Sequence, residues 1–157
     1  MVTIIDPHIK KDGEYHVSKQ GAELDVYIKN KDGSTDFDGW CWPGSSTWID
    51  FYNPKARDWW ASNFNYDKYV GSTKNLFTWN DMNEPSVFSG PEITIPKDVI
   101  HYGNVEHRNV HNLYGTMFVS SFFIFICFAL QRMDSVFIFS TIPFSVAFCH
   151  RTRPDAT

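Results

Sequence analysis

The stretch Trp79–Pro85 reads WNDMNEP and continues an apolar and aromatic run, Asn75–Trp79. A short apolar run followed by polar residues is typical of a β-strand, and this one would end at the carboxylate of Asp81. In a (β/α)₈ barrel the catalytic groups lie at the carboxyl ends of the strands. A carboxylate placed there beside aromatic side chains is what glycoside hydrolysis requires. From the spacing alone, a turn-capping role for Asp81 stays open.

Length and composition limit the possible folds and functions. The chain has 157 residues, whereas a complete (β/α)₈ barrel needs roughly 250, so we expect a partial barrel. With 14 basic and 18 acidic residues the net charge is −4, which does not favour nucleic-acid binding. Cys41, Cys127 and Cys149 are spaced neither as a metal site nor as a disulfide framework. Met1–Asp6 does not resemble a secretory signal, because it has no basic region and too short an apolar run.

The composition changes near Gly115. Residues 1–115 carry 11 Lys/Arg and 16 Asp/Glu, whereas nine of the fourteen Phe lie in residues 116–157. We therefore expect a partial catalytic barrel in 1–115 and a Phe-rich, apolar tail in 116–157. The uncharged run Leu113–Leu130 reaches the lower length limit of a membrane span. A buried pair of strands, including the run Ser135–Cys149, explains the tail equally well.

The first part of the chain predicts alternating strands and helices. The expected strands are Val2–Ile5, a half-exposed Glu23–Lys29, and Asn75–Trp79, with a turn at Asp32-Gly33. The expected helices run from Asn53-Pro54 to about Phe64 and from Glu106 to about Val119. Strand, excursion, helix, strand is the order found in a βα barrel or a doubly wound sheet.

Other candidates for chemistry lie near the ends of these elements. Glu84 follows Asp81 by three residues and is more suited to supporting it than to acting from the far side of a substrate. Asp6 follows the first strand, where a turn-forming role before Pro7 competes with a pocket role. Trp40 and Trp42 could form a wall on which a sugar ring stacks, or could simply pack.

Three histidines raise the question of a metal site. His107 and His111 are four residues apart and would share a helix face, with His101 nearby. No HExxH pattern accompanies them, so we expect solvated or packing histidines and no metal.

The motifs together resemble glycoside hydrolase family 31, whose nucleophile signature is W-x-D-M-N-E. Residues 79–84 match that signature, residues 4–9 (IIDPHI) resemble an upstream strand end, and residues 39–44 (GWCWPG) resemble the family's W-P-G loop. Residues 80–90 and 101–115 are similar in particular to the subfamily of eukaryotic glucosidase II catalytic subunits. The resemblance covers about residues 2–115.

The resemblance implies a retaining α-glucosidase on a (β/α)₈ barrel. Asp81 matches the nucleophile, and Glu84 would support it. No metal or organic cofactor is implied. The substrate-binding residues that it implies are Trp42, Met82, Ile4, Trp79 and Asp6.

The same resemblance implies an α-glucoside or N-glycan oligosaccharide as substrate and a non-catalytic β subunit as partner. It also implies that the protein is located in the endoplasmic reticulum, although this chain shows no signal peptide. The family's acid/base Asp lies on a later strand, and neither Asp134 nor Asp155 has family-like neighbours. We therefore expect the nucleophile half of an active site, with little or no turnover by this chain. Two alternatives stay open: a non-catalytic carbohydrate- or subunit-binding form, and a membrane-attached protein.

Overall fold

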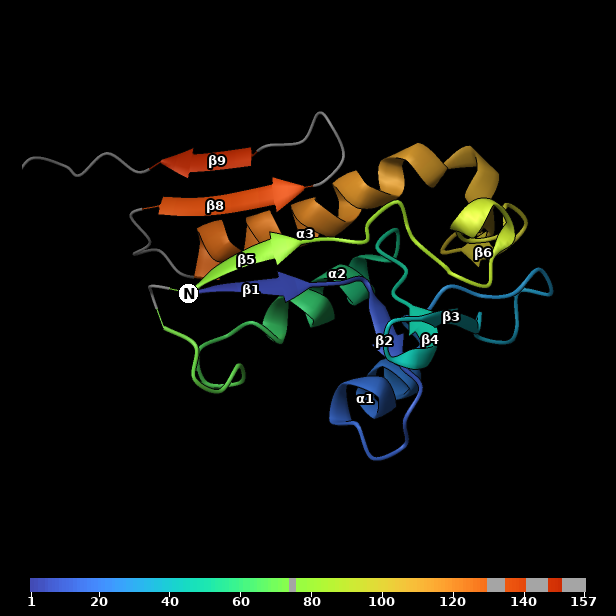
Figure 1. Cartoon of the computed structure of the whole chain (residues 1–157), viewed down its shortest axis with the longest axis horizontal. Helices are drawn as coiled ribbons and strands as arrows, with labels where there is room; N and C mark the ends of the chain where they lie inside the picture. Colours follow the sequence, from blue (N-terminus) through green and yellow to red (C-terminus); the bar gives the residue numbers. More distant parts are fainter. Residues whose placement is uncertain (74–75, 130–134, 141–146, 151–157) are drawn as a thin grey trace, which may run out of the picture.

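The computed structural model describes residues 1–73, 76–129, 135–140 and 147–150, with side chains as far as residue 121 (Figure 1). Its α-helices are α1 His16–Leu24, α2 Pro54–Ser62 and α3 Tyr114–Ala129. Short 3₁₀ turns span Pro91–Ile93, His107–Asn109 and His111–Leu113. The strands are β1 Val2–Ile5, β2 His8–Lys10, β3 Gly39–Cys41, β4 Gly44–Trp48, β5 Phe77–Asn80, β6 Ile100–His101, β7 Val105–Glu106, β8 Ser135–Ser140 and β9 Ala147–His150.

A parallel sheet organises the chain. The strand order is β1-β5-β8-β9, with β1, β5 and β8 parallel and β9 antiparallel to β8. Helix α2 connects toward β5 and α3 connects toward β8, and the two helices pack against each other along the sheet (Figure 1). Parallel strands joined through helices are the repeating unit of a (β/α)₈ barrel. The predicted α/β architecture and the strand Val2–Ile5 are confirmed, and β5 overlaps the predicted strand Asn75–Trp79, whose Asn75 lies outside the described residues.

Two long excursions lie beyond the arrowheads of β1 and β5 (Figure 1). The first contains α1 and the antiparallel sheet β2-β4-β3, and the second contains the β6–β7 ribbon and the 3₁₀ turns. Both therefore lie at the carboxyl edge of the parallel strands. Loops at that edge carry the binding and catalytic groups in barrels of this type.

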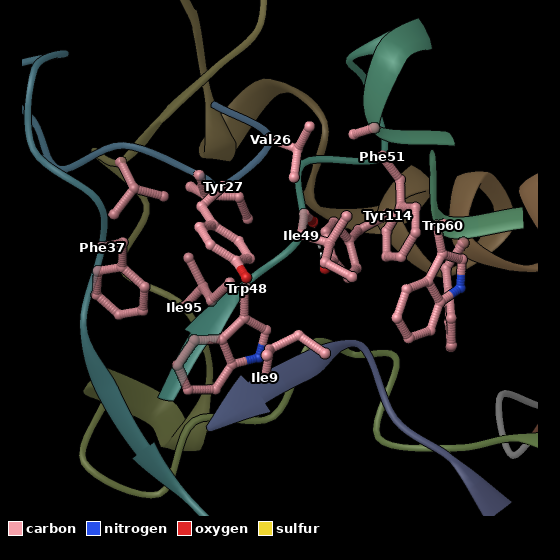
Figure 2. Close-up of a cluster of buried hydrophobic side chains, with 14 of the residues drawn as sticks. Ile9, Val26, Tyr27, Phe37, Trp48, Ile49, Phe51, Trp60, Ile95 and Tyr114 are labelled. Atoms are coloured by element: carbon pink, nitrogen blue, oxygen red, sulfur yellow. Dashed lines mark hydrogen bonds between the residues drawn. The ribbon is translucent and has the colours of Figure 1, made fainter. Parts of the chain in front are cut away.

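A largely aromatic core joins the helices to the first excursion (Figure 2). Trp48 and Phe51, at and after the end of β4, are fully buried. Phe51 contacts Tyr114 of α3 edge to face, with ring centroids 5.6 Å apart, and lies against Trp60 of α2 at 6.1 Å. The Tyr114 hydroxyl donates to the Ile49 carbonyl oxygen at 2.8 Å. Each aromatic pair contributes about 0.5–1.5 kcal/mol beyond its buried area, so this cluster holds the excursion on the helices.

Helix α2 begins where the sequence predicts. The Asn53 side chain accepts a hydrogen bond from the Lys55 backbone N–H at 3.0 Å, and Pro54 occupies the first turn. Asn is a favourable N-cap, and Pro costs nothing at the first helical position because its missing N–H would have no partner there. The buried face of the helix carries Ala56 and Trp60.

The predicted half-exposed strand Glu23–Lys29 is wrong. Its first residues belong to α1, which ends at Leu24 and is followed by Asp25 in a left-handed conformation with φ of 56°. The next segment, Val26–Ile28, is extended but fully buried rather than alternating. The Ile28 N–H donates to the Trp48 carbonyl at 2.9 Å, and the Asp50 N–H donates to the Val26 carbonyl at 2.9 Å. The apparent alternation thus combined the polar surface of a helix end with a buried segment.

The predicted helix Glu106–Val119 is wrong over its first half. Glu106 belongs to β7, and α3 begins at Tyr114 after two 3₁₀ turns separated by Val110. The His107 N–H donates to the Val99 carbonyl, just before β6, at 2.9 Å, so its backbone is held by that neighbouring segment and not by a helix. His107 and His111 therefore do not share an α-helical face.

The segment predicted as an apolar tail contains part of α3 and the strands β8 and β9. Strand β8 pairs in parallel with β5, and β9 pairs with β8. The division into residues 1–115 and 116–157 stays a prediction. Within the part of the chain that the structure describes, no helix combines the length and apolar character needed to cross a bilayer. Leu130, which ends the run Leu113–Leu130, lies outside the described residues.

Gly90→Ala should lower the free energy of unfolding of the chain by about 2 kcal/mol, since overpacking costs roughly 1–3 kcal/mol. A Cβ at Gly90 would lie 2.0 Å from the backbone oxygen of Thr94, beside the bridge that pairs Thr94 with Ser86. Urea unfolding followed by tryptophan fluorescence measures the change. Gly13→Ala is the control, because no atom lies within 4 Å of its added Cβ. Equal stability of both variants would contradict the tight turn at Gly90.

Candidate active site

The pairing of β1 with β5 places two carboxylates at one edge of the sheet. Ile5 lies opposite Asn80 in the parallel register, and each is followed directly by an aspartate, Asp6 and Asp81. The Asp81 N–H donates to the Ile5 carbonyl at 3.0 Å, which extends the strand pairing by one residue. The structure therefore brings together the two strand-end acids that the sequence singled out.

A tight turn holds the Asp81 carboxylate. The Met82 N–H donates to Asp81 Oδ1 at 2.9 Å, and Met82 itself is left-handed with φ of 56°. A non-glycine residue in that conformation costs free energy, so the surrounding bonds must fix it. One such bond runs from the Ser86 N–H to the Met82 carbonyl at 3.2 Å. Glu84 is exposed on the same turn and accepts a hydrogen bond from the Ser86 hydroxyl at 2.7 Å.

The electrostatics of Asp6 show that three acids lie close together. Burial raises the pKa of Asp6 to about 6, and the negative charges of Asp81 and Glu84 add to that shift. Its Oδ1 is buried without a hydrogen-bond partner among the described residues. Asp6 therefore holds a proton more tightly than an ordinary aspartate does.

His8 joins this group, although sequence reasoning did not select it. Its Nε2 lies 3.6 Å from Asp6 Oδ2, and its side chain is 3% exposed. Burial lowers the pKa of His8 to about 4, so the imidazole is neutral near neutral pH and the contact is not an ion pair. At 3.6 Å the contact is also too long for a hydrogen bond. The sequence feature that could have pointed to His8 is its position directly after the Asp6-Pro7 turn.

A cavity of about 1100 Å³ opens beside these residues. Ile4, Asp6, His8 and Trp42 contribute to its wall. The Trp42 side chain is 72% exposed and stands edge-on to Phe88, with ring centroids 4.9 Å apart. An exposed indole held by a second ring offers a stacking surface. The cavity wall does not include Asp81, Met82, Trp79 or Glu84. Asp81 and Glu84 instead act on Asp6 through their charges, and Trp79 pairs with Ile4 in the strand register.

Ile4 and Trp79 lie side by side on one face of the sheet, because they are partners in the strand register. Asp6 and Asp81 follow two residues later on each strand and continue the same face. Ile5 and Asn80 alternate with them, and Ile5 packs against the core. The indole Nε1 of Trp79 is buried without a hydrogen-bond partner among the described residues. In the described part of the chain, no group of three His, Cys, Asp or Glu residues is arranged to hold a metal ion.

Residues 1–142 match the sequence profile of the glycosyl hydrolases family 31 TIM-barrel domain. The chain belongs to glycoside hydrolase family 31. The resemblance predicted from the motifs is thus confirmed for the family, which is one of glycosidases and includes α-glucosidases.

Known relatives place the chain more closely within the family. Over 115 residues it is 64% identical to neutral alpha-glucosidase AB of Dictyostelium discoideum and 59% identical to the protein of that name from Homo sapiens. Each match covers 73% of this chain and 12% of the relative. A crystal structure of a glucosidase II alpha subunit, bound to DNJ, has a TM-score of 0.77 at 56% identity, over 80% of this chain and 13% of that chain. The catalytic subunit of an ER glucosidase II heterodimeric complex has a TM-score of 0.80 at 50% identity, over 88% and 16%.

The Asp6 carboxyl should titrate near pH 6, and Asp81→Asn should lower that midpoint because it removes a neighbouring negative charge. Carbon-13 NMR of the aspartate carboxyl groups measures both values. Asp12 is the internal control, because the Glu14 N–H holds its pKa below the usual range and Asp81 is not among the groups that shift it. A midpoint for Asp6 that does not respond to Asp81→Asn would contradict the proximity of the two acids.

Asp6→Asn should raise the stability of the chain at pH 7 by about 1–2 kcal/mol, after discounting for screening by solvent. The pKa of Asp6 is higher in the folded chain, so unfolding releases a proton between the two pKa values. Stability therefore falls as the pH rises through about 6, and the variant escapes this loss. Urea unfolding of the variant and of the unaltered chain at pH 4 and pH 7 measures the difference in stability. An advantage of equal size at both pH values would rule out a charge effect.

Proposed function

We propose that the protein to which this chain corresponds is a retaining α-glucosidase with Asp81 as its nucleophile. The observation that carries the proposal is the placement of Asp81 at the carboxyl end of β5, where the Met82 N–H holds one oxygen. A retaining glycosidase needs a carboxylate that attacks the anomeric carbon and forms a covalent glycosyl-enzyme. The fixed geometry of Asp81 supports this role, because a nucleophile held in place needs little reorganisation to attack.

We assign supporting roles to the residues around it. Trp42 and Ile4 would bound the sugar site on the cavity side, and Trp79 and Met82 would bound it beside the nucleophile. Trp42 is favoured as the stacking surface by its exposure and by its contact with Phe88.

The two other acids would adjust the charge around Asp81. Glu84 lies on the nucleophile turn, where its hydrogen bond with Ser86 stabilises the turn. Asp6 has a raised pKa, so a proton on Asp6 would reduce the negative charge beside Asp81 near pH 6. Neither Asp6 nor Glu84 is proposed as the proton donor, because residues beside the nucleophile approach a scissile bond from the same side. The family resemblance puts the donor on a later strand.

We further propose an oligosaccharide substrate that carries α-linked glucose, such as an N-glycan. Structures of glucosidase II alpha subunits bound to Glc1Man2 and to alpha3-Glc2 are similar to this chain at 49% and 55% identity. A regulatory subunit and the endoplasmic reticulum as location are proposed from the heterodimeric ER complex. The chain spans 12–13% of the length of curated relatives that it matches, so these proposals concern the protein as a whole.

For the 157-residue chain alone, we propose sugar binding at the Trp42 cavity without turnover. The cavity and the exposed indole lie within the described residues, whereas the second catalytic carboxyl of the family lies on a later strand. A general acid contributes about 10²–10⁴-fold to such reactions, so binding should survive where hydrolysis does not.

Asp81→Asn should abolish covalent labelling of the full-length enzyme by a fluorinated α-glucosyl fluoride, because an amide cannot replace the attacking carboxylate. Intact-mass spectrometry detects the added sugar. Asp12→Asn is the matched control, since Asp12 is partly exposed, pairs with Lys10 and lies outside the candidate site; it should label normally. Labelling that persists in Asp81→Asn would refute the assignment.

Trp42→Ala should weaken glucoside binding by about tenfold, because loss of a stacking ring costs roughly 1–2 kcal/mol. Isothermal titration of maltose into the 157-residue chain measures the affinity. Tyr66→Ala removes another exposed ring, outside the cavity wall, and should leave binding unchanged. Equal affinity of the Trp42→Ala variant and the unaltered chain would exclude this cavity as the sugar site.

A further inference from the structure

Four side chains outside the candidate active site form one continuous chain of hydrogen bonds. His101 Nδ1 lies 2.7 Å from Asp50 Oδ1, and His101 Nε2 lies 2.8 Å from His107 Nδ1. His107 Nε2 in turn lies 2.8 Å from His111 Nδ1. Asp50 precedes α2, whereas the three histidines belong to the second excursion, between β5 and α3. This histidine chain therefore fastens the excursion that follows the nucleophile to the start of α2.

The histidine chain is buried except at its His111 end. His101 and His107 are 2% and 0% exposed, Asp50 is 4% exposed, and His111 is partly exposed. A proton from solvent therefore meets the His111 end first.

Several titratable groups surround the histidine chain. The rings of Tyr52 and Tyr114 lie 5.1 and 6.4 Å from that of His101. Lys97 and Glu92 act on His111 with opposite signs. Asp25 and Lys29 share a cavity of about 270 Å³ with Asp50 and His101, and they form an ion pair with each other.

The Asp50 carboxylate fixes the direction of each hydrogen bond. It accepts the backbone N–H of Tyr52 at Oδ1, at 3.1 Å, and that of Tyr102 at Oδ2, at 2.6 Å. A carboxylate only accepts, so His101 Nδ1 is the donor toward it. A neutral imidazole has one N–H and one acceptor nitrogen. His101 Nε2 therefore accepts from His107 Nδ1–H, and His107 Nε2 accepts from His111 Nδ1–H. All three rings are then Nδ1–H tautomers, and His111 Nε2 is the acceptor at the accessible end.

We propose that the histidine chain is a one-proton wire that stores a proton as a His101 imidazolium beside the Asp50 carboxylate. A solvent proton binds His111 Nε2, and the proton on His111 Nδ1 passes to His107 Nε2. The proton on His107 Nδ1 then passes to His101 Nε2. One proton has entered and two have shifted, so His101 carries both ring protons and the other two rings are neutral Nε2–H tautomers. All three hydrogen bonds persist, two of them with donor and acceptor exchanged.

The capacity of the wire is one proton. A second proton, on His107 or His111, would direct two N–H groups at each other and break a hydrogen bond. Burial, with its histidine neighbours, lowers the pKa of His107 to about 3, and burial also lowers the pKa of His111. Both rings are thus held neutral, as both states of the wire require. The positive charge instead lies at His101, where the carboxylate 2.7 Å away stabilises it.

Uptake of one proton therefore keeps the excursion fastened to the start of α2, whereas further acidification releases the excursion. This follows because both states of the wire keep every hydrogen bond, whereas a second proton breaks one.

Nitrogen-15 NMR of the full chain, labelled in its histidine rings, tests the wire directly. At pH 8 we expect Nδ1–H tautomers at all three positions. On acidification His101 should become the imidazolium while His107 and His111 change to Nε2–H, with one shared midpoint. The Tyr102 amide should stay protected from exchange through that step. His16, which is exposed on α1, supplies a histidine signal from outside the histidine chain in the same spectra.

Four results would overturn the proposal: Nε2–H tautomers at pH 8, three separate midpoints, an imidazolium at His111 before His101, or unfolding before any proton uptake.

Two variants sharpen the test. Asp50→Asn removes the charge, 2.7 Å from His101 Nδ1, that stabilises the stored proton, so no His101 imidazolium should form while the other two rings change tautomer. His107→Phe cuts the wire, so His101 and His111 should titrate separately. His16→Phe is the matched control and should change neither the shared midpoint nor the tautomers of the three histidines. An unaltered shared midpoint in His107→Phe would also overturn the proposal.

Discussion

The parallel pairing of β1 with β5 is the constraint on which the rest of the molecule depends. Its register continues through the bond from the Asp81 N–H to the Ile5 carbonyl, at 3.0 Å. A shift of one residue would turn Ile4 and Trp79 to opposite faces of the sheet and would separate the two strand-end acids. The shared direction of the two strands places both excursions at the carboxyl edge, where the loops of a barrel can act on a substrate.

Sequence reasoning succeeded where a feature is encoded by neighbouring residues. The cap Asn53-Pro54 and the apolar run Val2–Ile5 are local signals, and both elements form as predicted. The proximity of Asp6 to Asp81 could be expected only through the barrel architecture, because it depends on strands far apart in the chain. The burial of His8 could not be predicted, since it depends on how the first excursion folds over Trp48, whose ring lies 5.9 Å from that of His8.

The failures share a physical cause, which is that a backbone group bonds to a partner outside its own local helix or strand. Tyr27 and Lys29 form bridges with Ile49 and Ile100, so their segment is buried and does not alternate. The His107 N–H bonds to the Val99 carbonyl, which excludes it from the helix that its sequence suggests. Helix propensity is worth a few tenths of a kcal/mol per residue, so a few such hydrogen bonds outweigh it. The histidine chain also depends on this arrangement, because a continuous helix would carry His107 away from His101.

The excursion between β5 and α3 has repulsion between carboxylates at its start and a chain of hydrogen bonds at its far end. At its start Asp81 and Glu84 lie near Asp6, whose pKa is raised by burial and raised further by the two neighbouring negative charges. That arrangement costs free energy and would relax if the turn after β5 could move away. At its far end the bonds from Asp50 through His111 close the excursion onto the start of α2. Closing a long loop costs entropy that grows slowly with length, so a few buried bonds can offset it. The hydrogen bonds at the histidine end of the excursion therefore help to hold Asp81 and Glu84 close to Asp6.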